Sequence, residues 1–271
     1  MSEEKDESRP REAFRLLWGI VARPRSTMER LSESGGRAWW LPAILAVVML
    51  VLPILVAAPI TARQTREAIL ATQEQMKEQW GETMPGQDEA QIEEAMAAAS
   101  SPLITVVFPS LGGVVGLAVG WLIWAGALHL ASMALGGRPS FGTMLRMVVW
   151  SWIPYAVRGL LQTVYILATG QLIANPGLSG LVADNRPVSE MVLAPPSTGQ
   201  ILLQALLSRI DIFLLWNLAL LVIGVMVTAR LPRRRAVLIT LGVWAVLTAL
   251  AMVPALIGAI FAQQAAFGPA P

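Results

Sequence analysis

The sequence has no cysteine and a single histidine, His129. The absence of cysteine excludes disulfides, thiolate metal sites and cysteine nucleophiles. Charge is also scarce, because charged residues make up 14% and hydrophobic residues 55% of the 271 positions. Ordinary soluble domains have about 25% charged and about 45–50% apolar residues. The composition therefore predicts an all-α fold, a polytopic membrane helical bundle, and it offers no set of residues for a metal, a cofactor or a catalytic triad.

Long apolar runs divide the chain into expected membrane crossings. A helix needs ~20 apolar residues to span the hydrocarbon core, and five runs are read as transmembrane helices on this basis. The run 103–135 is longer than one crossing requires, so it must tilt, kink at Pro109 or extend past the interface. The five spans are expected at about 40–60, 103–130, 148–170, 207–229 and 236–261, within a membrane domain 39–262 that is followed by a short tail, 263–271.

Basic residues gather in alternate connections. Residues 1–38 carry eight Lys or Arg, whereas the acidic loop 61–102 carries three and the loop 171–200 carries one. Cytoplasmic connections of membrane proteins are enriched in Lys and Arg, so the N-terminus is predicted to be cytoplasmic. The loop 61–102 is then extracytoplasmic and reads as two helices broken at Met84-Pro85-Gly86. The turn after the fourth span supplies four cytoplasmic basic anchors: Arg230, Arg233, Arg234 and Arg235.

The N-terminal region predicts two short helices. The spacing i, i+3, i+4, i+7 indicates an amphipathic helix and holds for Phe14, Leu17, Trp18 and Val21. This helix suits either a membrane interface or packing on the inner face of the membrane domain. Pro24 is expected to end it, and Ser26 with Glu29 fits the capping-box pattern for a second helix.

Polar side chains in the third and fourth runs alternate four and three residues apart, which places each set on one helix face. Such a face inside a membrane should look into the protein or a wet cleft. Asp211 is expected to pair with Arg158, as a structural clamp or as part of a functional site, and Arg209 competes for Asp211. The predicted intramembrane polar cluster comprises Ser151, Tyr155, Arg158, Gln162, Tyr165, Gln204, Ser208 and Asp211.

Three glycines in the second run, Gly112, Gly116 and Gly120, recur every fourth residue. Small residues at this spacing let helix backbones approach closely in lipid. We therefore predict a helix-packing face, in preference to a lipid or substrate groove. The same face permits self-association without requiring it.

Several short motifs resemble a known family when they are taken in order. They are Phe14-x-x-Leu17, Arg23-Pro24-x-x-Thr27, Gly136-Gly137-x-x-Ser140-Phe141, Trp152-x-Pro154-Tyr155 and Ile210-Asp211-Ile212-Phe213-x-x-Trp216. The pattern resembles the Yip domain family, membrane proteins named for interaction with Ypt/Rab GTPases, over roughly residues 14–262. The resemblance implies five spans and a cytosolic amino end. The composition is typical of a prokaryotic member, so Rab binding is not carried over, and a bacterial inner membrane location is expected.

Two functions remain open at this point. The first is a non-enzymatic membrane scaffold or adaptor, whose partners are the lipid bilayer and other membrane proteins or a second copy of the chain. The alternative is a transporter, channel or lipid-translocating protein that uses the polar face of the third span with Asp211. Catalysis, nucleic-acid binding and metal binding have no supporting pattern in the sequence.

Overall fold

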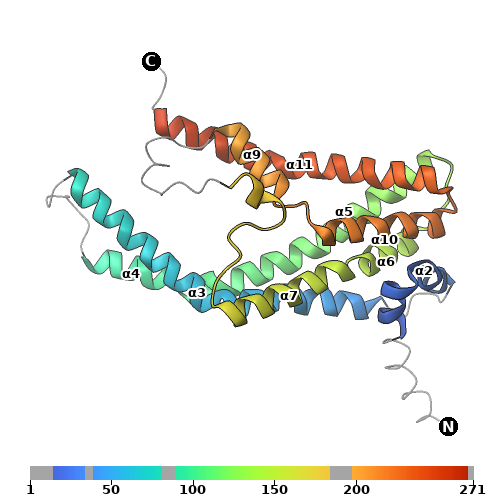
Figure 1. The fold of residues 1–271 in the computed structure, drawn as a ribbon, viewed down its shortest axis with the longest axis horizontal. Helices are drawn as coiled ribbons and strands as arrows, with labels where there is room; N and C mark the ends of the chain where they lie inside the picture. The colour runs from blue at the N-terminus through green and yellow to red at the C-terminus, as the bar shows by residue number, and fades with distance from the viewer. Residues whose placement is uncertain (1–14, 34–38, 81–88, 184–196, 268–271) are drawn as a thin grey trace, which may run out of the picture. The chain divides into compact units, whose positions relative to one another are not determined.

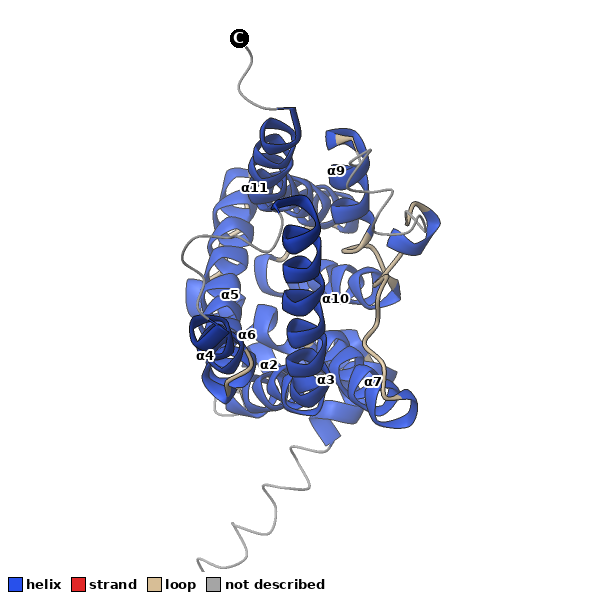
Figure 2. Cartoon of the chain, turned by 90° about the vertical axis from the view of Figure 1, so that its left-hand side faces the viewer, coloured by secondary structure: helices blue, strands red, loops and turns tan. Residues whose placement is uncertain are grey.

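The computed structural model describes residues 15–33, 39–80, 89–183 and 197–267 (Figure 1). Within these ranges the regular elements are all helical and no strand occurs, as Figure 2 also shows. Contacts divide the chain into two compact units. Unit 1 comprises residues 1–43, 121–155 and 174–271, and unit 2 comprises residues 44–120 and 156–173.

Among the described residues, four helical stretches are long and apolar enough to cross a membrane: Trp40–Glu74, Met96–Ala134, Ile212–Ala229 and Arg233–Phe261. They correspond to four of the five predicted spans. The remaining predicted span, 148–170, falls on two shorter helices. The all-helical membrane fold is thus confirmed, and the fifth crossing stays a prediction.

The third apolar run breaks at Trp152, between α6 (Phe141–Ser151) and α7 (Ile153–Thr169). Pro154 has no N–H to donate, and its ring would meet the Trp150 carbonyl if α6 continued through it without a break. The Tyr155 N–H donates instead to the Trp152 carbonyl at 3.0 Å. At 17 residues, α7 is about 26 Å long, slightly shorter than a ~30 Å hydrocarbon core.

Unit 2 contains most of α3 (Trp40–Trp80), α4 (Glu89–Ala99), the π-helical turn η1 (Leu103–Val107) and the start of α5 (Phe108–Ala134). The π-helical turn directly precedes Pro109, and the Phe108 N–H donates to the Leu103 carbonyl. Widening of a helix at this point accommodates a proline ring that would otherwise meet the carbonyl four residues earlier. The predicted disturbance at Pro109 is therefore a π-helical turn. The predicted break at 84–86 lies outside the described residues.

In unit 1, α10 (Ile212–Ala229) packs against α2 (Pro24–Glu33), α6 and α11 (Arg233–Phe267). α9 (Thr198–Leu207) packs against α11 and the 3-10 turn η2 (Ser179–Leu181). The predicted fourth span, 207–229, is therefore interrupted, because α9 ends at Leu207 and α10 begins at Ile212. Large side chains fully buried in this unit include Trp150, Ile20, Met28, Met144, Leu220 and Leu221.

The N-terminal helices differ from the prediction in their boundaries. Residues 15–22 are helical, and Pro24 begins α2 instead of only ending the preceding helix. Proline fits the first turn of a helix because the N–H it lacks would have no partner there. Ser26 lies inside this turn and donates to the Arg23 carbonyl at 3.2 Å, so it does not cap α2. Glu29 pairs with Arg25 at 3.1 Å.

Candidate functional site

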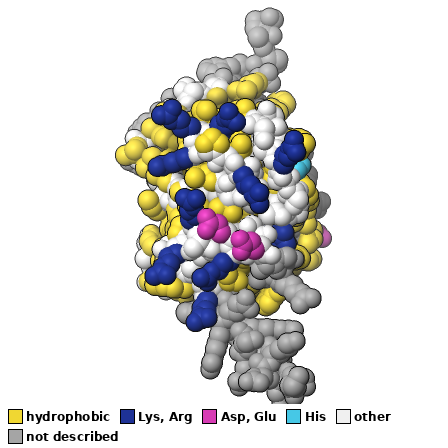
Figure 3. All heavy atoms as spheres, turned by 90° about the vertical axis from the view of Figure 1, so that its right-hand side faces the viewer, with side chains coloured by type: hydrophobic (Ala, Val, Ile, Leu, Met, Phe, Trp, Pro, Cys, Tyr) yellow, Lys and Arg dark blue, Asp and Glu magenta, His cyan; other side chains and the backbone are white. Residues whose placement is uncertain are grey.

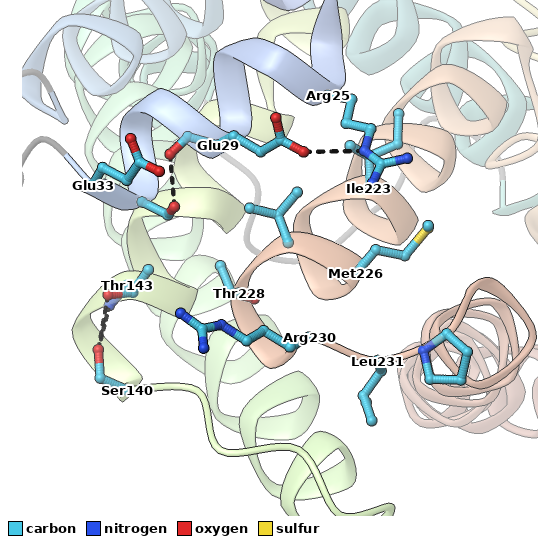
Figure 4. A pocket seen from close by; sticks show the side chains of 13 residues that line it. Arg25, Glu29, Glu33, Ser140, Thr143, Ile223, Met226, Thr228, Arg230 and Leu231 are labelled. Carbon is cyan, nitrogen blue, oxygen red and sulfur yellow. Dashed lines mark hydrogen bonds and ion pairs between the residues drawn. The ribbon is translucent and has the colours of Figure 1, made fainter.

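Unit 1 contains a groove of about 830 Å³ with charged and polar lining, shown in Figure 4. One wall is α2, a second is the beginning of α6, and the third is the last two turns of α10 with the turn into α11. We call it the α2 groove. Its charged lining side chains are Arg25, Glu29, Glu33 and Arg230, and apolar lining comes from α10 and the following turn, including Ile223, Met226 and Leu231.

Some of the polar groups lining the α2 groove satisfy one another. The Arg25 guanidinium donates to Glu29 across one turn of α2 at 3.1 Å. On the facing wall, the Ser140 hydroxyl caps α6 by accepting from the Thr143 N–H at 3.2 Å, and it donates to the Thr143 hydroxyl at 2.8 Å. Both interactions stay within their own helix.

Arg230 holds an uncommon backbone conformation at the edge of the groove. It terminates α10 with φ 52° and ψ 37°, the left-handed region. Glycine usually takes this position because a Cβ is disfavoured there. Arg230 is the only non-glycine residue with positive φ in the part of the chain that the structure describes. Figure 4 shows its side chain extending over the groove toward the Thr143 wall.

The surface around this groove is rich in arginine. Figure 3 shows basic side chains spread across this face, with a few acidic ones among them. The predicted basic anchors differ in their surroundings. Arg233 and Arg234 are exposed at the start of α11, whereas the Arg235 guanidinium donates a hydrogen bond to the Leu135 carbonyl at 3.1 Å. That bond satisfies a carbonyl left open at the end of α5.

Asp211 caps α10 and lies before its first residue. Its Oδ1 accepts a hydrogen bond from the Leu214 N–H at 2.8 Å, with an extended backbone at Asp211 itself. This geometry explains why an acid stands at the head of an apolar run, since a cap satisfies one of the open N–H groups and a carboxylate complements the helix dipole.

We expect Asp211→Ala to lower the stability of detergent-purified protein by about 1 kcal/mol through loss of the cap. Asp211→Asn keeps a side-chain oxygen for the Leu214 N–H and removes only the charge. If the charge is paired with Arg158, Asp211→Asn also lowers thermal stability, and Arg158→Gln in that background adds little. Strictly additive losses in this double-mutant cycle would rule out the pairing.

Asn217 is a polar residue that sequence reasoning missed. It lies in α10 with 1% of its surface exposed, and its Nδ2 donates to the Ser151 carbonyl at 2.6 Å. Ser151 is the last residue of α6, so this bond satisfies a carbonyl released by the break at Trp152. The sequence feature that could have indicated this role is a single amide side chain within the apolar stretch Ile212–Ala229.

Comparison with protein families shows to which family the chain belongs. The model of the Yip1 domain matches residues 18–254. The chain belongs to the Yip1 domain family. No curated protein and no solved structure matches the chain. The family resemblance found in the motifs is thus confirmed, and the Yip1 family is not known as an enzyme family.

The motif residues of this Yip1 domain have local structural roles. Gly136 adopts φ 87°, and a Cβ on Gly137 would lie 3.0 Å from the Ala229 Cβ, so both positions of the pair suit glycine. The Thr27 hydroxyl donates to the Arg23 carbonyl at 3.0 Å. The Trp152-x-Pro154-Tyr155 motif forms the α6–α7 break. Phe14 lies outside the described residues.

The predicted polar cluster of the Yip1 domain is distributed over both units. Ser151 is buried and donates to the Met147 carbonyl at 2.7 Å, and Ser208 donates to the Ala205 carbonyl at 2.8 Å. Gln204 is exposed. Unit 1 holds these three with Tyr155 and Asp211, whereas unit 2 holds Arg158, Gln162 and Tyr165. Their assembly into one cluster therefore stays a prediction.

Two glycines that the spacing did not single out pack helices within unit 2 of this Yip1 domain. A Cβ at Gly112, Gly116 or Gly120 would meet nothing within 4 Å among the described residues. A Cβ at Gly113 would lie 2.8 Å from Leu50, and one at Gly159 would overlap the backbone carbonyl of Met49. Close packing within unit 2 thus uses Gly113 and Gly159, and the packing role of Gly112, Gly116 and Gly120 stays a prediction.

Proposed function

We propose that this Yip1 protein is a non-enzymatic adaptor of the cell membrane, which binds a second membrane-associated protein through its helix 15–22. The observation that carries the proposal is the two-sided environment of this helix. Ile20 is fully buried, whereas Trp18 is 66% exposed and Val21 is 47% exposed. Tryptophan and arginine are enriched at the energetic centres of protein interfaces, and the exposed Arg15 lies one turn before Trp18.

The helix is held against the rest of unit 1, which supports a docking role. A Cβ on Gly19 would lie 2.5 Å from the Thr27 hydroxyl oxygen, so helix 15–22 approaches α2 closely. α2 in turn packs against α10 and α6. A surface fixed in this way loses little conformational freedom when a partner binds. The distribution of basic residues supports a cytoplasmic position for this surface, and the prokaryotic type of composition supports the inner membrane of a bacterial cell.

A photo-crosslinking amino acid at Val21, in full-length protein in native membranes, tests the adaptor function. We expect one discrete protein adduct, which Trp18→Glu abolishes because a charge replaces the apolar anchor. The matched control is Leu181→Glu, at a side chain 78% exposed in η2, which should leave the adduct unchanged. Lipid adducts alone, or a protein adduct indifferent to Trp18→Glu, would rule out this docking surface.

The alternative is a solute- or lipid-translocating protein, and one observation favours it. The third apolar run is broken at Trp152, and α7 carries the half-buried Arg158 and Gln162. Broken helices form the central sites of many transporters. Vesicles reconstituted with the protein should then show solute, ion or lipid flux that Asp211→Asn abolishes, whereas a broad panel without flux favours the adaptor.

A further inference from the structure

Among the residues that the structure describes, the α2 groove leaves one exposed cation and one exposed anion without an ion-pair partner. Arg25 and Glu29 pair with each other. Arg230 and Glu33 also line the groove, and neither forms an ion pair with any other residue that the structure describes. A ligand that carries one negative and one positive group would match both.

The groove is built at one end of a helix that is long and apolar enough to cross a membrane. Its third wall is the end of α10, an apolar helix long enough to cross a membrane, and α10 ends at Ala229. The hydrocarbon core gives way to the polar headgroup layer at the end of such a helix. Ile223, Met226 and Leu231 form an apolar edge beside the charged lining. This combination suits an amphiphile better than a fully polar solute.

We propose that the α2 groove binds the headgroup of an aminophospholipid from the surrounding membrane. The shared chemistry is a phosphate diester joined by a short linker to a primary ammonium. Arg230 donates to the phosphate oxygens, in the geometry that makes arginine a preferred phosphate ligand. Glu33 accepts from the ammonium N–H groups. The inference goes beyond the adaptor function, because the groove is lined by α2, α6 and α10 and not by helix 15–22.

Two features of the groove walls favour binding of the phosphate group beside Arg230. α6 begins at the groove with Ser140 as its cap, and the first turn of a helix favours negative charge. The left-handed backbone of Arg230 is disfavoured for a residue with a Cβ. A basic residue at this position directs its guanidinium over the groove, as Figure 4 shows, which glycine would not do.

Thermal unfolding of the full-length protein in mild detergent, titrated with defined lipids, tests the site. We expect phosphatidylethanolamine to raise the Tm at a concentration about tenfold lower than phosphatidylcholine needs, because the trimethylammonium group has no N–H for Glu33. Phosphatidylglycerol, which has no ammonium, should resemble phosphatidylcholine. Soluble phosphoethanolamine, which lacks the acyl chains, should raise the Tm little.

Two substitutions test which group of the lipid headgroup Glu33 and Arg230 each bind. Glu33→Gln should remove the preference for phosphatidylethanolamine over phosphatidylcholine while phosphate binding persists. Arg230→Asn should weaken the response to both lipids about tenfold, and asparagine tolerates the left-handed backbone. The matched control is Arg234→Asn, which removes the same charge from an exposed position that does not line the groove and should leave the response unchanged.

The outcomes that overturn the proposal are distinct. Equal stabilisation of the wild-type protein by phosphatidylethanolamine and phosphatidylcholine would show that Glu33 does not recognise the ammonium group. A stronger effect of phosphatidylglycerol, or an equal loss in Arg234→Asn, indicates general attraction to anionic surfaces. An equal effect of soluble phosphoethanolamine indicates a site for a free phosphate ester and overturns the lipid assignment.

Discussion

Gly159→Leu is expected to prevent stable folding of unit 2, the largest effect of any single substitution considered. A Cβ at Gly159 overlaps the Met49 carbonyl, so α7 cannot keep its present distance from α3. Backbone atoms cannot move aside as a flexible side chain can, and we expect a loss of about 3 kcal/mol or more, at the upper end for overpacked sites. The measurement is the midpoint of unfolding in a detergent titration, followed by helical circular dichroism.

The matched control for Gly159 is Gly116→Leu, which makes the same chemical change on another helix of the same unit. Gly116 has no atom within 4 Å of an ideal Cβ among the described residues, so its unfolding midpoint should stay near that of the wild type. If both variants lose stability equally, the leucine acts through something other than the α3–α7 contact, and the close packing described for Gly159 is wrong.

Asn217→Leu is the substitution with the second largest expected effect. Leucine keeps the number and branching of the side-chain heavy atoms, although its methyl groups are bulkier, and it removes the donor that binds the Ser151 carbonyl at 2.6 Å. A buried carbonyl then has no partner at the break between α6 and α7, which costs about 1–3 kcal/mol. Hydrogen bonds between side chains of membrane helices contribute less on average, about 0.6 kcal/mol. The Asn217 bond is expected to contribute more, because its acceptor is a main-chain carbonyl at a helix end. Thermal unfolding measures the loss.

The control for Asn217 is Ser151→Ala, which acts on the same residue pair but spares the bond. The Ser151 hydroxyl donates within its own helix to the Met147 carbonyl, and Asn217 contacts only the Ser151 main chain. Removing the hydroxyl should therefore cost less than about 1 kcal/mol. A larger loss for Ser151→Ala than for Asn217→Leu would show that the break is held by some other interaction.

Apolar periodicity and length predicted the helical membrane fold because burial in lipid imposes a minimum helix length that is visible in the sequence. The positions of four crossing helices follow from it. The motifs around Pro24, Trp152 and Asp211 also led to the family, which the Yip1 domain match confirms. Proline chemistry accounts for the break before Pro154 and for the π-helical turn before Pro109. The region 148–170 was nevertheless expected to be one continuous span, and a kink at Pro109 was only one of three alternatives for the run 103–135.

The packing details could not be read from the pattern. Gly112 and Gly113 are neighbours in the chain but face directions ~100° apart on a helix, and among the described residues of unit 2 it is Gly113 that meets another helix, at Leu50. Spacing shows which small residues share a face, not which face meets a neighbour. The partner of Asn217 was equally hidden, because it is a main-chain carbonyl 66 residues away. The α2 groove depends on three helices distant in sequence.

The topology of the protein depends on the number of crossings, since the broken helix α6–α7 decides whether there are four or five. The chain has no cysteine, so a single introduced thiol reports unambiguously on its own position. Ser26, Gln171 and Arg234 are exposed and represent α2, the loop after α7 and the start of α11.

The decisive measurement is the reaction of Ser26→Cys, Gln171→Cys and Arg234→Cys with an impermeant maleimide, in right-side-out and inverted membrane vesicles. Five crossings predict that positions 26 and 234 react only in inverted vesicles and that position 171 reacts only in right-side-out vesicles. Positions 26 and 171 reacting together, with position 234 on the opposite side, would rule out the five-span topology, because α7 would then not cross the membrane.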